Sequence, residues 1–136
     1  MTGTPNAAIY YVPEGYTTAG ERIMGIQAAS EGMLHGFIRH GGVDRLYAFA
    51  EHPASGTAFA QAVAAIDPRL ATEWIPTGEV ERLAPIGTLM LPGPGLSAYA
   101  WMRRRLGGAA FSLCGITHAT TTPLVLDAIA DLPVEP

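Results

Sequence analysis

The chain has 136 residues, of which 49% are hydrophobic and 15% are charged. This balance excludes an intrinsically disordered chain, and the length suits one domain, residues 1–136, with a large core. The formal net charge is -4 and all eight basic residues are arginine, so the chain lacks the broad basic surface that favours nucleic acid as a partner.

The number of cysteines and the sequence of the N-terminus indicate in which cellular compartment the protein is found. Cys114 is the only cysteine, which excludes an intrachain disulfide and a cysteine-based zinc site. The first residues contain no signal-peptide pattern, and no segment approaches the roughly 18 apolar residues of a membrane span. We therefore expect a cytoplasmic protein.

Five short apolar segments are predicted to be strands. They are near-continuous apolar runs rather than alternating ones, which is typical of a parallel sheet buried on both faces. They cover residues 7–12, 45–50, 72–76, 87–92 and 109–117.

Four segments with helical spacing separate or follow these strands, at residues 25–42, 55–68, 96–108 and 121–132. Two glycines end the first, and Ser55 is the predicted cap of the second. The last has Thr121 or Thr122 as cap and Pro123 at its first position. Residues 78–86 form either one helical turn or a loop.

Strands and helices thus alternate along the whole chain. This order predicts an α/β fold, a Rossmann-like open parallel sheet of about five strands with helices on both faces. Ligands of such sheets bind beyond the carboxyl ends of the strands, so residues that directly follow a strand are the candidates for a site.

The segment between the first strand and the first helix contains Gly15, Gly20 and Gly25. Glycines before a helix let backbone N–H groups approach a phosphate or a sugar, and Arg22 adds an anion contact. The spacing matches neither the dinucleotide-binding nor the P-loop pattern. A flexible loop and a binding loop are equally consistent with it.

His118 follows the fifth strand, in the stretch "FSLCGITHATTTP". A histidine there is either a structural hydrogen-bonding residue or a catalytic one. Thr117 and Thr120 beside it either cap the next helix or hydrogen-bond a polyol. Gly115 has no side chain, so the chain is narrow at this position. Cys114 lies within the strand, where we expect a buried, unreactive side chain.

One basic cluster, Arg103 to Arg105 after Trp101 and Met102, ends the third helix. A solvated helix end is the simplest interpretation, because cations favour a helix C-terminus. The alternative is weak peripheral attachment to an anionic lipid surface, or contact with an anionic acceptor.

Two segments, "RIMGIQAASEGMLHGFIRHGG" and "FSLCGITHATTTPLVLDAIADL", resemble the N-terminal domain of bacterial glycosyltransferases of family 4. These retaining enzymes have the GT-B architecture of two Rossmann-like domains. The resemblance covers nearly the whole chain, and the strand that runs into Gly-Ile-Thr-His is its most specific part.

The resemblance implies that this domain holds the acceptor, while a C-terminal domain holds the nucleotide-sugar donor. It places Gly20, Arg22 and Gly25 near the donor phosphates or the acceptor, and His118 facing the transferred sugar. It implies no metal and no cofactor. The second domain is missing from the sequence, so we expect a truncated, partner-dependent half of an enzyme that is inactive alone.

Two other functions are consistent with the same residues. One is a stand-alone, non-catalytic α/β module that binds a small sugar or anionic ligand through the first loop and His118. The other is an orphan fragment without function. Neither the donor nor the acceptor follows from the sequence.

Overall fold

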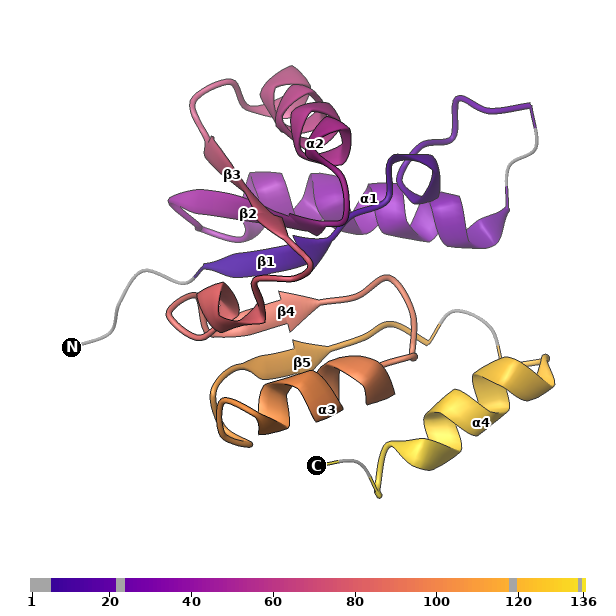
Figure 1. The fold of residues 1–136 in the computed structure, drawn as a ribbon. Helices are drawn as coiled ribbons and strands as arrows, with labels where there is room; N and C mark the ends of the chain where they lie inside the picture. Colours follow the sequence, from indigo (N-terminus) through magenta and orange to yellow (C-terminus); the bar gives the residue numbers. More distant parts are fainter. Residues whose placement is uncertain (1–5, 22–23, 118–119, 135) are drawn as a thin grey trace.

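A computed structural model describes residues 6–21, 24–117, 120–134 and 136 (Figure 1). In these residues five parallel strands form one sheet, flanked by four helices, which confirms the predicted α/β fold. The strands are β1 (Ala7–Tyr10), β2 (Arg45–Ala50), β3 (Ala71–Pro76), β4 (Thr88–Met90) and β5 (Ser112–Cys114). The helices are α1 (Gly25–His40), α2 (Pro53–Ile66), α3 (Ser97–Arg104) and α4 (Pro123–Asp131), with 3₁₀ turns η1 (Pro13–Gly15) and η2 (Val80–Leu83).

The sheet has the strand order β3-β2-β1-β4-β5, so β1 lies at its centre. Ala8 of β1 pairs with Tyr47 of β2 on one side and with Leu89 of β4 on the other. The chain reaches β3 at one edge and then returns to pair β4 with β1. The order of the strands therefore reverses between β1 and β4, which is where open parallel sheets form a crevice at their carboxyl ends.

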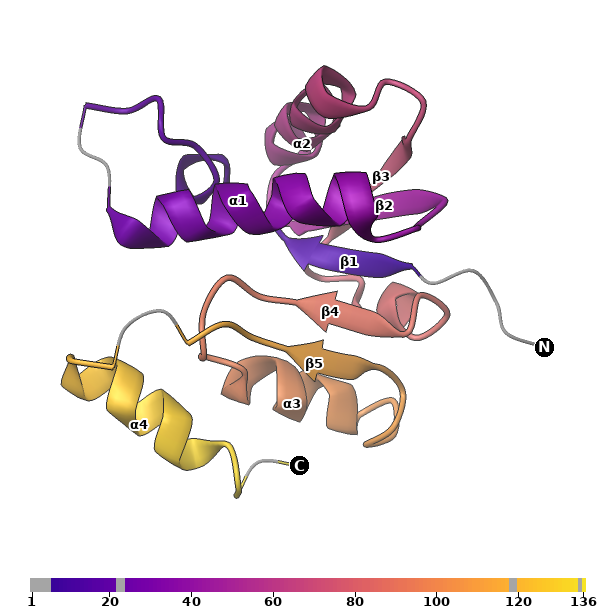
Figure 2. The ribbon, with the colours of Figure 1, turned by 180° about the vertical axis from the view of Figure 1, so that it is seen from behind.

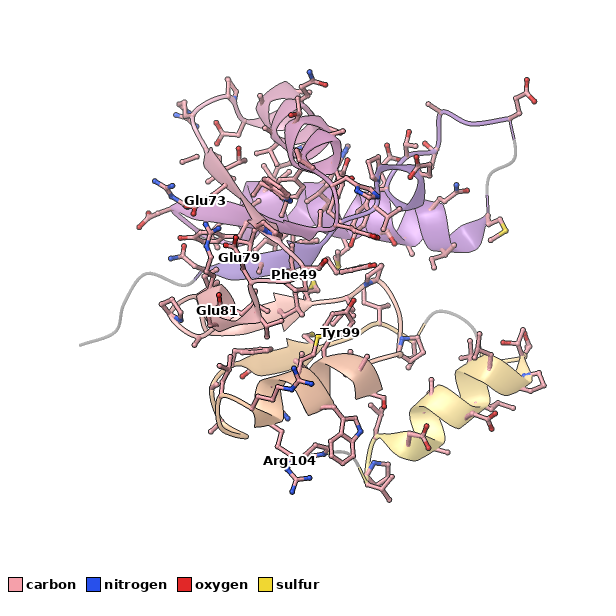
Figure 3. All side chains as sticks on the ribbon, in the orientation of Figure 1. Phe49, Glu73, Glu79, Glu81, Tyr99 and Arg104 are labelled. Atoms are coloured by element: carbon pink, nitrogen blue, oxygen red, sulfur yellow. The ribbon has the colours of Figure 1, made fainter. Side chains whose placement is uncertain are left out.

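Two apolar cores lie on opposite faces of this sheet. Helices α1 and α2 cover the first core, in which Ile9 of β1 packs with Leu34 and Phe59. Turn η2 and helix α3 cover the second core, which contains Phe49 and, at its margin, Tyr99 (Figure 3). The centres of these two rings are 6.1 Å apart. Helix α3 lies in front of the sheet in Figure 1, and α1 lies in front in the reverse view (Figure 2). Burial on both faces explains the continuous apolar runs of β1 and β2.

Most helix ends lie where the sequence predicts them, with one correction. Helix α1 ends before Gly41, and Gly42 adopts a positive φ of 63°, which favours glycine. Helix α2 begins at Pro53 with His52 as its N-cap, so the predicted cap Ser55 is wrong. Proline suits the first helical position because its fixed φ is helical and no N–H is needed there.

Strand β5 is the second correction. It covers three residues instead of the predicted nine, and it pairs only with β4. Leu113 faces the second core, but Cys114 is exposed rather than buried. An edge strand has a neighbour on one side only, so an apolar run does not guarantee that both of its faces are covered.

Helix α4 begins as predicted, with the Thr122 side chain accepting from the Val125 backbone N–H and Pro123 in the first turn. None of its residues is buried, and Leu124 is 81% exposed.

Within the described residues, no helix combines the length and the apolar character needed to cross a membrane.

Candidate functional site

The carboxyl ends of the strands form the edge at which a site is expected. The loop after β1, the junction between β2 and α2, and the segment that leads from β5 to α4 all leave the sheet at this edge (Figure 1). Strand β4 lies between β1 and β5. The loop after β1 and the segment after β5 therefore leave the sheet two strand spacings apart, about 10 Å.

A hollow of about 480 Å³ opens at the carboxyl ends of β1 and β2. Its walls combine aromatic rings, carboxylates, an imidazole and a hydroxyl, and none of the described residues that line it is arginine or lysine. The lining residues are Tyr10, Tyr11, Val12, Pro13, Glu14, Glu51, His52, Ala54 and Ser55.

One wall of the hollow is the start of the loop after β1, which hydrogen bonds hold in place. The Tyr16 hydroxyl donates to the Tyr10 carbonyl at 2.8 Å. The Gln27 side chain donates to the Glu14 carbonyl at 2.9 Å and accepts from the Met24 N–H at 2.8 Å. Both ends of the loop are therefore tied to α1, which orders the backbone that carries Glu14.

The opposite wall comes from the junction between β2 and α2. Glu51 and His52 directly follow the last residue of β2, and His52 is the N-cap of α2. The two walls are joined where the Tyr11 N–H donates to the Phe49 carbonyl at 3.1 Å. The segments that follow two neighbouring buried strands thus bring Glu14, Glu51 and His52 into the lining of the same hollow.

Tyr11 of this wall and the neighbouring Tyr16 carry neutral hydroxyl groups at neutral pH. Burial raises the pKa of Tyr11 above its ordinary value, and the nearby Glu14 carboxylate raises it further. Burial also raises the pKa of Tyr16. Neutral phenols, carboxylates and an imidazole together can exchange hydrogen bonds with a polyhydroxylated ligand. The described lining contains neither arginine nor lysine, the two side chains that most often bind phosphate as cations.

The predicted site residues that the structure describes lie at the same edge but outside the hollow. Gly20 and Gly25 are exposed in and after the loop that follows β1, and a Cβ at either would meet nothing within 4 Å. Thr117 and Thr120 are exposed in the segment after β5. Arg22 and His118 lie outside the described residues.

The loop after β4 and the segment after β5 are brought together by one glycine. The Leu91 N–H donates to the Cys114 carbonyl at 2.8 Å, and a Cβ at Gly115 would lie 2.5 Å from the Gly93 carbonyl oxygen. The segment that leads toward Thr117 can pass this loop only because residue 115 has no side chain.

The sequence prediction missed Glu14, Glu51 and His52. The same rule that singled out His118, a polar residue directly after an apolar strand, also applies to Glu51 and His52 after the run that ends at Ala50. That rule could have found this pair. Glu14 carries no such signal, since only the turn η1 brings it back beside β2.

Among the described residues, no group of three or more His, Cys, Asp or Glu side chains is arranged to hold a metal ion.

No protein family model, no curated protein and no solved structure matches this chain. The assignment of a function therefore depends on the sequence pattern and on the geometry of this edge.

Proposed function

We propose that this chain is the acceptor-side domain of a retaining glycosyltransferase, which transfers a sugar from a nucleotide-sugar donor to an acceptor and is inactive alone. The observation that carries the proposal is the hollow at the ends of β1 and β2. Its carboxylates Glu14 and Glu51 can accept hydrogen bonds from the hydroxyl groups of an acceptor, and the adjacent tyrosines offer an aromatic wall.

The charge of the hollow supports the proposal that this domain binds the acceptor and a second domain binds the donor. A nucleotide-sugar donor carries a diphosphate, which arginine, lysine or a helix N-terminus would bind. The first turn of α2 also lines the hollow, but it lies beside two carboxylates, and none of the described lining residues is arginine or lysine, so the hollow suits a neutral acceptor better than a diphosphate. The donor would be bound by the second domain, close to Gly20, Arg22 and Gly25.

The exposed apolar side chains of α4 support a contact with that second domain. Leu124 is 81% exposed, Leu126 is 50% exposed and Val134, just beyond the helix, is 76% exposed. Several exposed apolar side chains on one short helix and the residues after it suit a contact with another domain. The single cysteine and the absence of a disulfide suit a reducing compartment, and we place the protein in the cytoplasm.

In this proposal the domain acts mainly by positioning. The acceptor hydroxyl oxygen forms a bond to the anomeric carbon, the bond from that carbon to the donor phosphate breaks, and the leaving phosphate takes the acceptor proton. Glu14 and Glu51 orient the acceptor, while His118, Thr117 and Thr120 face the sugar in transfer. Positioning and stabilisation of developing charge can supply most of such a rate enhancement.

The test joins this chain to the nucleotide-sugar-binding domain of a retaining two-domain glycosyltransferase and measures release of nucleoside diphosphate with a panel of acceptors. We expect no turnover by the chain alone and turnover by the joined protein. Glu51→Gln should raise KM for the acceptor about tenfold, as loss of a hydrogen bond to a charged group does. His118→Ala should lower kcat.

Glu81→Gln is the matched control, because Glu81 is an exposed glutamate on η2, away from the hollow (Figure 3). A joined protein that folds, binds the donor and gives no turnover with any acceptor would contradict the proposal. NMR titration of the chain alone with methyl glycosides supplies a second readout. Binding at Glu51 and His52 without turnover in any pairing would favour the stand-alone sugar-binding module.

A further inference from the structure

The outward face of α3 carries apolar side chains where a surface helix usually carries polar ones. Ala100 is 3% exposed and faces the core, whereas Trp101 is 51% exposed and Met102 is 37% exposed. Leu106, just after the helix, is 42% exposed. We call Trp101, Met102, Arg104, Arg105 and Leu106 the α3 end patch.

The three consecutive arginines have different environments. Arg103 is half-buried and donates to the Phe111 carbonyl at 3.1 Å and to the Pro136 carbonyl at 2.7 Å, so it is a structural residue. Arg104 and Arg105 are exposed. The ion pairs formed within the described residues use Arg45, Arg69 and Arg82, which leaves both patch arginines without a carboxylate.

The patch lies in a part of the chain that has no acidic residue. No aspartate or glutamate occurs between Glu81 and Asp127, although the whole chain has a net charge of -4. Three of the four arginines in this stretch lie at the end of α3. The guanidinium of Arg104 lies 5.3 Å from the centre of the Trp101 ring, so the cationic and aromatic groups form one surface.

We propose that the α3 end patch binds an anionic lipid surface. Tryptophan beside leucine and methionine is suited to the boundary between headgroups and acyl chains, and arginines are attracted to anionic headgroups. A nucleic acid would need a longer basic stripe and would gain little from exposed Met102 and Leu106. A patch of this size gives reversible binding that salt weakens.

The position of the patch leaves the candidate site free. Helix α3 starts after β4, at the carboxyl edge of the sheet, and ends before β5, at the amino edge. Figure 3 shows Arg104 pointing away from the sheet. The hollow at the ends of β1 and β2 lies at the opposite edge, so a lipid surface on the patch would not cover it. The proposal is independent of the glycosyltransferase assignment.

The test is co-sedimentation of the full chain with vesicles of phosphatidylglycerol and phosphatidylcholine, compared with vesicles of phosphatidylcholine alone. We expect binding to the anionic vesicles only, and release as salt is raised. Arg104→Glu with Arg105→Glu should weaken binding about tenfold or more, since each basic residue near the surface contributes about fivefold. Trp101→Ala should also weaken it.

The matched control is Arg39→Glu with Arg69→Glu, which makes the same change in net charge at exposed residues elsewhere. The control should bind like the unchanged protein. Equal loss in both double variants would overturn the proposal, because net charge alone would then explain the binding. Equal binding to both vesicle types, or none to anionic vesicles at low salt by the folded chain, would also overturn it.

Tryptophan fluorescence gives a second readout that does not depend on sedimentation. The chain has two tryptophans, and Trp74 is half-buried with its Nε1 donating to the Ala50 carbonyl at 3.0 Å. A blue shift on addition of anionic vesicles should therefore come from Trp101 and should disappear in Trp101→Phe. A shift that persists in that variant would contradict insertion at the patch.

Discussion

At the residue scale, Gly115 illustrates how the absence of a side chain can position a candidate site. The segment after β5 passes the loop after β4 so closely that a Cβ at residue 115 would lie 2.5 Å from the Gly93 carbonyl oxygen. It would also lie 3.1 Å from the Leu96 side chain. The obstacle is backbone, which cannot rotate away as the end of a flexible side chain would.

We therefore expect Gly115→Ala to lower the free energy of unfolding by about 1–3 kcal/mol, the usual cost of overpacking. Gly95→Ala is the control, because it lies in the neighbouring loop and a Cβ there meets nothing within 4 Å. It should change stability by less than about 0.5 kcal/mol. Urea unfolding of both variants measures the difference, and equal stabilities would show that the contact relaxes without cost.

At the element scale, the packing of α2 on β3 depends on a second close approach. A Cβ at Gly56 in α2 would lie 2.7 Å from both Cβ and Cγ of Trp74 in β3. Trp74 is in turn fixed by the hydrogen bond from its Nε1 to the Ala50 carbonyl. The helix and the strand are therefore held at a distance that allows only glycine between them.

Glycine-to-alanine changes in the two long helices should have opposite effects. Gly56→Ala should destabilise the fold by about 1–3 kcal/mol, because the clash with Trp74 exceeds the gain in helix propensity. Gly32→Ala in α1 should stabilise it by about 0.5–1 kcal/mol, because Gly32 is exposed with nothing within 4 Å. Thermal and urea unfolding measure both, and a loss of stability in Gly32→Ala would contradict the assigned exposure.

At the scale of the whole molecule, buried and half-buried phenols on the two faces of the sheet couple stability to alkaline pH. Burial raises the pKa of Tyr11 and Tyr16 on the first face and of Tyr99 on the second. The ordinary pKa of each is 10.0, which is the value expected in the unfolded chain. Above that pH the folded protein retains protons that the unfolded chain loses.

We expect the stability contributed by these tyrosines to be fully present below pH 10 and to decrease as the pH rises above it toward their higher folded values. Urea unfolding at increasing pH, followed with tyrosinate absorbance, measures the effect. Tyr99→Phe should make the decrease less steep. An unfolding free energy that stays constant above pH 10 would mean that the phenols ionise freely in the fold.

Much of the fold was predictable from local sequence patterns, but the candidate site was less so. The apolar runs and glycine stops predicted β2 and the ends of α1 closely, because a buried strand and a helix C-terminus leave local signatures. The exposure of Cys114 was not predictable, since it depends on which strand lies at the edge. The roles given to His118 and Arg22 stay predictions.

By itself, the sequence determined the alternation of strands and helices, the parallel sheet with helices on both faces, and the start of α4 at Pro123, because apolar runs, helical spacing and a proline after threonine are signals within short segments. Only the tertiary structure decided that Glu14 lines the same hollow as Glu51 and His52, that Gly115 passes close to Gly93, and that Trp101 and Met102 on α3 stay exposed. These features join or expose residues through the order of strands in the sheet, which no local pattern encodes.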